Sequence, residues 1–258
     1  MSALVAVTLG NSSAALALAA EGAAGIAVEH VRRVPVDRLE DLVADLAQAR
    51  ARDDRPALPV IVASVNPGAM ERLRRLAAEA AAVSPLVAGT DFPIPIKTAV
   101  DEPKRVGADR LLEALAAYRR FGRACIVADF GTAITVNAVG PDGTFVGGAI
   151  FPGLAMMARA LSNGTALLPT IPAPAAAPLI GRNTVEAISA GILRGTAGAV
   201  TGLIAAARRV VGSDARVVLT GGAAPVIADL LPADCRIIIQ NLVFEGLLAA
   251  YDRWKNHT

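Results

Sequence analysis

Aromatic residues, cysteines and histidines are scarce in this sequence, and their scarcity excludes several classes of protein. Of the 258 residues, 3% are aromatic and 54% are hydrophobic. The two cysteines, Cys125 and Cys235, lie far along the chain from the two histidines, so the clustered ligands that a zinc site needs are missing. We therefore expect a core of Ala, Val, Leu and Ile that includes two reduced, buried thiols.

Long basic blocks and long uninterrupted apolar runs are also missing. No Lys/Arg block exceeds two residues and the formal net charge is +2, whereas a nucleic-acid partner usually needs a concentrated basic face. No basic segment precedes an apolar one at residues 1–4, so no signal peptide is evident. The most apolar stretch, residues 187–207, contains Arg194 and several glycines, which predicts a buried helix and not a membrane span. We expect a cytoplasmic protein without a nucleic-acid or membrane partner.

Hydrophobic patterning predicts a mixed α/β chain, long enough for two lobes or for one large α/β domain. Predicted strands fall at residues 3–18 (two strands joined by a turn), 59–65, 124–129, 134–139, 144–150, 216–219 and 236–240. Predicted helices fall at residues 36–52, 68–83, 111–118, 185–211 and 242–254, and a further helix follows Gly221-Gly222.

An internal repeat favours the two-lobed interpretation. Residues 5–12 align with residues 126–133 at a constant offset, and each copy consists of a strand, a turn of glycine and polar residues, and the start of a second strand. The repeat predicts a duplicated fold, with an N-terminal lobe at 1–117 and a C-terminal lobe at 118–258. The alternative is a chance similarity between two apolar strands.

Three glycine turns are candidates for binding phosphate. They lie at Gly10–Ser13, Gly131–Thr132 and Gly221–Gly222. Glycine lets backbone N–H groups approach phosphate oxygens without obstruction by a β-carbon, and a neighbouring hydroxyl or amide adds a side-chain donor. Each turn has an alternative, purely structural interpretation, but three of them in a duplicated chain favour a nucleotide site.

Two aspartates are candidates for chemistry. Asp109 precedes a predicted helix, where it is either an N-cap or a general base for a substrate hydroxyl, with Arg110 beside it to bind a carboxylate or phosphate. Asp129 ends an apolar strand next to Gly131, where a carboxylate either caps the turn or binds a cation.

Several segments, taken in order, resemble the signature segments of the type III pantothenate kinases, and the resemblance runs from Leu4 to about Leu247. The matching segments are 107–110 (Gly-Ala-Asp-Arg), 129–133 (Asp-Phe-Gly-Thr-Ala), 147–150 with 152–153, and 183–184 with 191–192. The resemblance implies two duplicated ribonuclease-H-like lobes with an ATP cleft between them. It further implies phosphorylation of pantothenate at the head of coenzyme A synthesis, Mg²⁺ with the ATP, a monovalent cation (K⁺ or NH₄⁺), and a homodimer.

The resemblance also implies roles for individual residues. Asp109 would be the general base, Asp129 would hold the monovalent cation, and the turn that follows Thr8 would bind the ATP phosphates together with Thr132. The residues of that turn are Gly10, Asn11, Ser12 and Ser13. The residues of the pantothenate pocket would be Val100, Gly107, Ala108, Arg110 and Thr184.

Three positions depart from the family pattern. Thr8 stands where the family has an Asp, Val100 where it has a Tyr, and Asn137 at a third acidic position. These departures keep two alternatives open beside an active pantothenate kinase. One is a catalytically impaired homologue that acts as a ligand-binding regulatory or interaction protein, and the other is a kinase or phosphatase for a different hydroxylated substrate.

Overall fold

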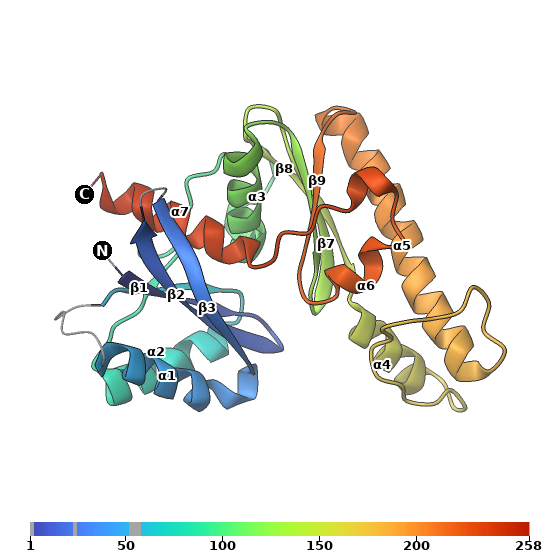
Figure 1. Cartoon of the computed structure of the whole chain (residues 1–258), viewed down its shortest axis with the longest axis horizontal. Helices are drawn as coiled ribbons and strands as arrows, with labels where there is room; N and C mark the ends of the chain where they lie inside the picture. The colour runs from blue at the N-terminus through green and yellow to red at the C-terminus, as the bar shows by residue number, and fades with distance from the viewer. Residues whose placement is uncertain (1–2, 23–24, 52–57, 258) are drawn as a thin grey trace. The chain divides into compact units, whose positions relative to one another are not determined.

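A computed structural model describes residues 3–22, 25–51 and 58–257, and the chain divides into two compact units (Figure 1). The first unit comprises Met1–Ile96, Lys104–Ala116 and Leu242–Thr258, and the second comprises Lys97–Pro103 and Ala117–Asn241. The predicted lobes were continuous segments that met between residues 117 and 118. The chain passes instead between the units four times, and its closing helix belongs with the first unit.

The first unit is built on a five-stranded sheet of order β3-β2-β1-β4-β5. Its strands are β1 (Ala3–Leu9), β2 (Ser13–Gly22), β3 (Gly25–Pro35), β4 (Val60–Ser64) and β5 (Leu86–Val87). Its helices are α1 (Leu39–Ala51), α2 (Pro67–Ala81), α7 (Leu242–Lys255) and the first part of α3 (Ala108–Phe121), with short 3₁₀ turns at Val36–Arg38 and Pro103–Arg105.

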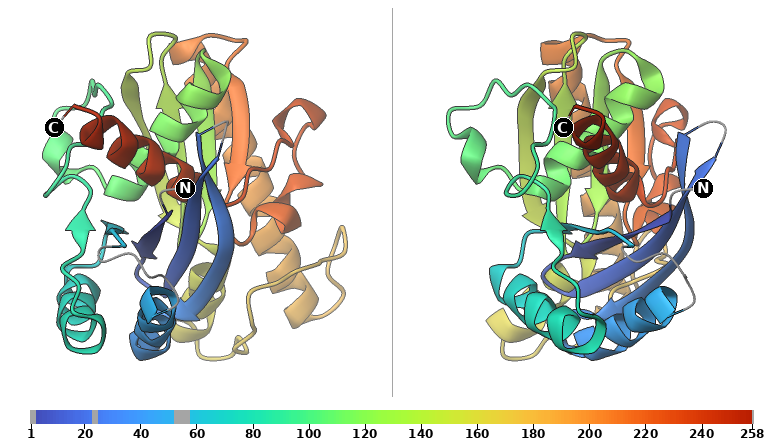
Figure 2. Two further views of the ribbon diagram at one scale, coloured as in Figure 1. Left: turned by 60° about the vertical axis from the view of Figure 1, so that its left-hand side comes forward. Right: turned by 90° about the vertical axis from the view of Figure 1, so that its left-hand side faces the viewer.

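Alternation along β1 sends side chains to both faces of this sheet. Val5, Val7 and Leu9 pack in one apolar cluster with α1 and α2, whereas Leu4 and Ala6 pack in the other with α3 and α7. Figure 2 shows α1 and α2 on one side of the strands and α7 on the other. Burial on both faces explains why β1 and β4 are almost continuously apolar.

The closing helix α7 joins the first unit because its apolar side chains complete that second cluster. Phe244 and Leu247 are fully buried there, and Phe92, Tyr251 and Trp254 form a group of aromatic rings with centroids 5.7–5.8 Å apart. The sequence carries few aromatic residues, and it concentrates three of them where this helix docks on its unit.

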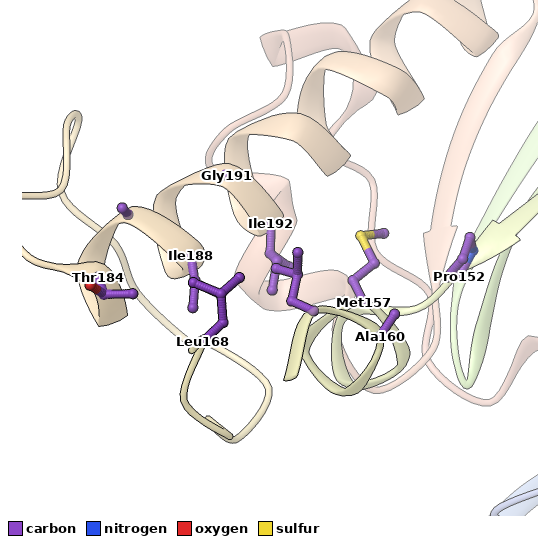
Figure 3. Close-up of a pocket in the computed structure, with 10 residues that line it drawn as sticks. Pro152, Met157, Ala160, Leu168, Thr184, Ile188, Gly191 and Ile192 are labelled. Atoms are coloured by element: carbon purple, nitrogen blue, oxygen red, sulfur yellow. The ribbon is translucent and has the colours of Figure 1, made fainter. Parts of the chain in front are cut away.

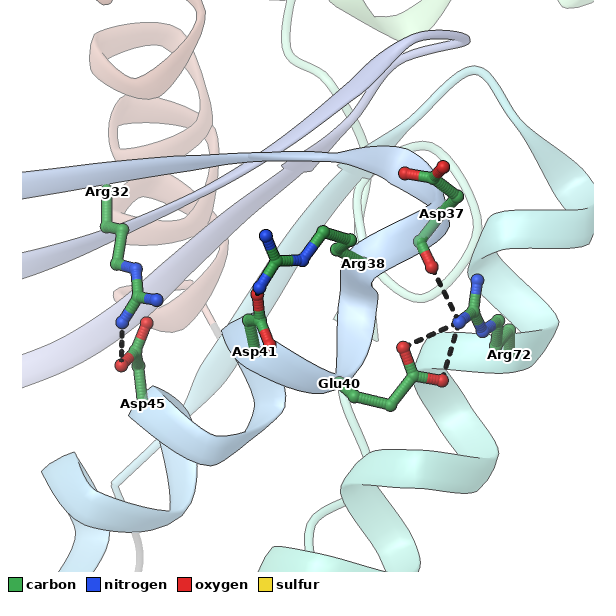
Figure 4. Close-up of polar contacts among 7 residues, drawn as sticks. All are labelled: Arg32, Asp37, Arg38, Glu40, Asp41, Asp45 and Arg72. Atoms are coloured by element: carbon green, nitrogen blue, oxygen red, sulfur yellow. Dashed lines mark hydrogen bonds and ion pairs between the residues drawn. The ribbon is translucent and has the colours of Figure 1, made fainter.

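Ion pairs connect the outer surfaces of the elements around α1 (Figure 4). Arg72 of α2 donates to both carboxylate oxygens of Glu40, at 2.5 and 2.6 Å, and to the backbone carbonyl of Asp37 at 2.9 Å. Arg32 of β3 pairs with Asp45 of α1. These contacts are exposed to solvent, so we assign them a role in orienting α1 and only a small contribution to stability.

The second unit has a four-stranded sheet of order β8-β7-β6-β9. Its strands are β6 (Cys125–Phe130), β7 (Ala133–Val139), β8 (Phe145–Pro152) and β9 (Arg216–Thr220). Its helices are the last part of α3, α4 (Leu154–Gly164), α5 (Thr184–Val211) and α6 (Ala224–Ala228), with a 3₁₀ turn at Ala233–Cys235.

The two sheets share one connectivity. β1 pairs antiparallel with β2 and parallel with β4, and β6 pairs antiparallel with β7 and parallel with β9. In each unit the third strand then pairs antiparallel with the second. The repeat at residues 5–12 and 126–133 therefore falls on equivalent strands, β1 and β6, of a duplicated α/β fold.

Helix α5 is 28 residues long and apolar. Within the part of the chain that the structure describes, it alone has the length and composition of a membrane span, and half of its most apolar window is buried inside the unit. Ile188, Ile192 and Val200 pack in the cluster that also contains Ile126 of β6. This packing is that of a core helix, which is what the glycines and Arg194 predict.

Some elements differ from those predicted. The strand expected at residues 236–240 is an isolated bridge between Ile238 and Leu219, with two backbone hydrogen bonds to β9. β3 and α4 were not anticipated, although α4 has apolar residues at helical spacing, with Leu154 and Ala158 buried on one face. Both thiols are buried and free, as predicted, and burial raises the pKa of Cys125 to about 11.

Candidate active site

The turn between β1 and β2 presents polar side chains to solvent. The amide of Gly10 donates to the carbonyl of Ser13 at 2.9 Å, which closes the turn. The amide of Val36 donates to the carbonyl of Ser12 at 3.1 Å. Asn11, Ser12 and Ser13 are exposed, so their side chains are accessible to a ligand. We call residues 10–13 the Gly10 turn.

Asp109 lies in the first turn of α3, one residue inside the helix. Its Oδ1 accepts a hydrogen bond from the amide of Arg110 at 2.8 Å, so it bonds one of the free amides of the helix start. The carboxyl group is largely surrounded by protein. Burial raises its pKa, while the amide and the positive charge of Arg110 act in the opposite direction. A half-buried carboxylate with a raised pKa is the kind of group that serves as a general base.

The side chain of Asp109 lies so close to the backbone of residue 107 that this residue must be glycine. A β-carbon added to Gly107 would lie 2.5 Å from Oδ1 of Asp109 and 3.4 Å from Cγ1 of Val65. Val65 follows β4, and its amide donates to the carbonyl of Leu9 at 3.0 Å. Asp109 and the Gly10 turn therefore lie at the same end of the first sheet, beyond the carboxyl ends of β1 and β4, where α/β proteins commonly bind ligands.

Thr8 lies on β1 just ahead of that turn. It is half-buried, with Ala15 of β2 and Ala63 of β4 as its neighbours across the strands. None of the residues at 8–13 or 63–66 is acidic. The carboxylates at this end of the first sheet therefore come from other segments, among them Asp109 of α3 and Asp37, which follows β3 where Pro35 pairs with Ser13.

Asp129 has two threonines beside it in the second sheet. It pairs with Thr135 of β7 on one side and with Thr220 of β9 on the other. Side chains that are directly opposed across strands point to the same face, so the carboxylate and two hydroxyl groups form one row. Thr135 and Thr220 are buried, with 8% and 3% of their surface exposed. Sequence reasoning identified Asp129 but missed both threonines, which only the register of the strands reveals.

Two of the three glycine turns meet at Asp129. A β-carbon on Gly131 would lie 3.3 Å from Oδ2 of Asp129, and one on Gly221 would overlap Oδ1. Gly221 has a φ of +87°, a left-handed conformation that glycine adopts without strain. The amide of Gly153, just ahead of α4, donates to the carbonyl of Thr132 at 3.1 Å.

Asn137 is fully buried on the same face as Asp129 and Thr135. Its Nδ2 donates to Oγ1 of Thr135 at 3.0 Å. Gly148 lies opposite on β8, where a β-carbon would be 2.9 Å from Oδ1 of Asn137. The amide at this position therefore orients the hydroxyl group beside Asp129. Among the residues that the structure describes, no three His, Cys, Asp or Glu side chains form a metal-binding group.

The predicted pantothenate residues are distributed over both units. Gly107, Ala108 and Arg110 accompany Asp109 in the first unit, and burial lowers the pKa of Arg110. Val100 belongs to the second unit, because residues 97–99 bond to Phe145 on both sides, at 2.8 and 2.9 Å. Its Cγ1 lies 3.6 Å from the position of a β-carbon on Gly147.

Thr184 opens α5 and lines a cavity of about 550 Å³ between α4 and α5 (Figure 3). The other lining residues carry no charge and are mainly apolar, and they include Met157, Leu168, Ile188 and Ile192. Thr184 is exposed, and its hydroxyl group is a polar feature at the end of an otherwise apolar surface.

Duplicated α/β units with a glycine turn after the first strand of each define the actin-like fold of ATPases and kinases. Solved structures that share this fold include the two that follow. A putative Baf family transcriptional activator from Campylobacter jejuni has a TM-score of 0.62 at 18% identity, over 98% of this chain and 100% of that one. Component A of (R)-2-hydroxyglutaryl-CoA dehydratase from Acidaminococcus fermentans has a TM-score of 0.56 at 14% identity, over 100% and 99%.

The chain belongs to the type III pantothenate kinase family, whose profile matches residues 4–206. Type III pantothenate kinases of Thermomicrobium roseum and Myxococcus xanthus are 37% and 34% identical to it, over 75% and 89% of this chain and 74% and 89% of theirs. The enzyme of an Anaeromyxobacter species is 33% identical over 97% of this chain and 99% of its own length. The family resemblance found in residues 107–110 and 129–133 is thereby confirmed.

Proposed function

We propose that this protein transfers the γ-phosphoryl group of ATP to the hydroxyl group of pantothenate, the first step of coenzyme A synthesis. Membership of the family supports the reaction, and the half-buried carboxylate of Asp109 beside the Gly10 turn supports the mechanism. Phosphoryl transfer depends mainly on positioning and on neutralising charge, with a base to accept the hydroxyl proton. The site therefore needs only a base, groups that position the two substrates and groups that neutralise the phosphate charge.

Asp109 is the proposed general base. Its Oδ1 is bonded to the amide of Arg110, which fixes the carboxyl group in one orientation. Oδ2 then accepts the proton of the pantothenate hydroxyl while the hydroxyl oxygen attacks the γ-phosphorus, and the bond between that phosphorus and ADP breaks. The raised pKa makes the carboxylate a better proton acceptor than an exposed aspartate.

Arg110, Gly107 and Ala108 are proposed to bind pantothenate next to that base. A guanidinium group binds a carboxylate through two parallel hydrogen bonds, and pantothenate carries one carboxylate. Val100 and Thr184 are proposed to contact the same substrate. Valine at position 100 is smaller than the tyrosine of the family and provides no hydroxyl group, so this contact is apolar.

The ATP phosphates are proposed to bind at the Gly10 turn, with Thr8 at its start, and at Thr132. Asp129 is proposed to hold a monovalent cation, K⁺ or NH₄⁺. One carboxylate flanked by the hydroxyl groups of Thr135 and Thr220 is an all-oxygen set suited to a hard cation of low charge. When bound, this cation would neutralise part of the triphosphate charge. Mg²⁺ would enter with ATP, and Thr8 would offer it a hydroxyl group but no charge.

A homodimer and a cytoplasmic location complete the proposal. The dimer is supported by exposed apolar side chains on and between α4 and α5, namely Met156, Leu167, Leu179, Ile180 and Val185. Exposed apolar side chains are typical of an interface where they form one patch. Light scattering coupled to size exclusion would give twice the 26.3 kDa chain mass for this dimer and the single mass for a monomer.

The reaction is tested with the purified chain, ATP, Mg²⁺ and K⁺ in an assay coupled to ADP release. We expect turnover with pantothenate and none with a panel of sugars and other hydroxy acids. A folded protein that binds nucleotide but releases no ADP with pantothenate would favour the ligand-binding regulator, which no comparison supports at present. Turnover with another alcohol would favour a kinase of different specificity.

A further inference from the structure

We infer that Asn66 holds the Gly10 turn in its phosphate-binding conformation and is a positioning residue for ATP, which presupposes that the turn binds phosphate as proposed above. Asn66 lies between β4 and α2 and takes no part in the proposed chemistry. Its side chain connects two segments that are 56 residues apart in the sequence. Both ends of its amide group are engaged.

One end of the amide caps a helix. Oδ1 of Asn66 accepts a hydrogen bond from the amide of Ala69 at 3.0 Å, and the residue has the extended backbone of an N-cap, with φ −128° and ψ 96°. Pro67 follows as the first helical residue, where its missing N–H leaves no unpaired donor. This contact is local and stabilises α2.

The other end reaches the Gly10 turn. Nδ2 of Asn66 donates to the carbonyl of Gly10 at 3.4 Å. The orientation of the amide group follows from its partners, because the N–H of Ala69 only donates and the carbonyl of Gly10 only accepts. A reversed amide would place donor against donor and acceptor against acceptor. The backbone of Asn66 is itself held by Ser64, whose Oγ accepts from the amide of Asn66 at 3.2 Å.

The bond to the Gly10 carbonyl fixes the direction of the next amide. In a planar trans peptide the C=O and N–H groups point in opposite directions, so a Gly10 carbonyl held toward Asn66 directs the N–H of Asn11 away from it. The other peptide group of Gly10 is already fixed by the bond to Ser13. With both peptide groups held, the turn presents the N–H of Asn11 in one direction, as a phosphate-binding turn must.

Two substitutions separate the cap from the contact with the turn. Asn66→Ser keeps an N-cap of comparable strength but is too short to reach Gly10, whereas Asn66→Ala removes both interactions. Aspartate is avoided because its charge would itself repel phosphate. Affinity for a non-hydrolysable ATP analogue is measured by calorimetry on the full chain with Mg²⁺, together with kcat, the two KM values and Tm.

We expect both variants to bind the analogue roughly three- to tenfold more weakly, the loss of one hydrogen bond, with a matching rise in KM for ATP. The KM for pantothenate should not change. Only Asn66→Ala should lower Tm clearly, because only it loses the cap. If Asn66→Ser binds the analogue as tightly as the wild type, Asn66 is a helix cap and the inference is wrong.

The outcomes also separate this inference from the proposed function. Weaker analogue binding by Asn66→Ser, in a protein that makes no phosphopantothenate, would uphold the role of Asn66 and contradict the kinase activity. If Asn66→Ser instead phosphorylates pantothenate and binds the analogue as tightly as the wild type, the kinase activity is upheld and the role of Asn66 is contradicted. A wild-type protein that does not bind the analogue at all would overturn both.

Discussion

Asp129 and Gly221 are packed so closely that no other residue fits at position 221. A β-carbon there would overlap Oδ1 of Asp129 and would lie 2.7 Å from the backbone N and C of Phe130. The left-handed φ of +87° adds strain for any residue with a β-carbon. The turn after β9 is therefore shaped around the carboxylate that ends β6, and the two strands act as one support for the proposed cation.

Replacing Gly221 tests this relationship, and the next residue provides the control. Gly221→Ala should destabilise the protein by about 1–3 kcal/mol and displace Asp129. Gly222→Ala should be nearly neutral, because a β-carbon at position 222 meets open space. Chemical denaturation measures the free energy of unfolding, and K⁺ titration of the activity measures the cation site. Equal effects of the two substitutions would contradict the close packing.

Asp109→Asn should lower kcat by about 10²- to 10⁴-fold, the usual contribution of a general base. Asparagine has nearly the same shape and retains an oxygen for the amide of Arg110, so the fold and the affinity for ATP should be preserved. Measured turnover checks the loss of kcat, and calorimetry checks that the affinity for ATP is preserved. A variant with full activity would mean that Asp109 is only a stabiliser of the first turn of α3.

The raised pKa of Asp109 predicts a dependence of activity on pH. The base must be ionised, so kcat/KM should rise with pH through a midpoint above the ordinary aspartate value of about 3.9. Rates measured from acid to neutral pH give this midpoint. A midpoint at or below the ordinary value would mean that burial does not raise the pKa of Asp109.

The stability of the protein should also depend on the ionisation of Asp109. Unlike the activity, it should fall as the pH rises. Because the folded pKa lies above the unfolded one, the folded state binds more protons between the two values. The contribution of Asp109 to the free energy of unfolding is thus fully present below the unfolded pKa and is lost as the pH rises through the folded pKa. Wild type should therefore lose stability relative to Asp109→Asn across this window in denaturant titrations. A constant difference between the two proteins would contradict the shift.

Thr8→Asp should restore a charge to the Gly10 turn. The position is half-buried between Ala15 and Ala63, so the new carboxylate costs stability unless a cation is bound. We expect a lower Tm in chelator, recovery of Tm with Mg²⁺ and ATP, and a lower Mg²⁺ concentration for half-maximal rate. Thr8→Val controls for loss of the hydroxyl group. Identical Mg²⁺ titrations for wild type and Thr8→Asp would show that position 8 does not face the metal and phosphates.

Part of this site is readable from the sequence because the relevant residues are close in the chain. The Gly10 turn, Asp109 with Arg110, and Asp129 with Gly131 each lie on a short segment whose pattern of strand, turn or helix start is local. The equivalence of β1 and β6 is also visible, because a duplicated strand keeps its spacing. These features need no knowledge of which strands are neighbours.

Other parts depend on strand register and on long-range packing. Thr135 and Thr220 flank Asp129 only because β7 and β9 pair with β6 in one particular register. Asn66 reaches Gly10 because β1 and β4 are parallel neighbours. The closing helix α7 belongs with the first unit because its apolar side chains complete a cluster formed by much earlier residues. No local pattern contains this information.

The most direct measurement is detection of phosphopantothenate by mass spectrometry after incubation of the purified chain with pantothenate, ATP, Mg²⁺ and K⁺. The account predicts a product heavier than pantothenate by one phosphoryl group, formed in proportion to ADP by the wild type and almost absent with Asp109→Asn. No such product from a folded wild-type protein that binds ATP, or equal amounts from both proteins, would contradict it.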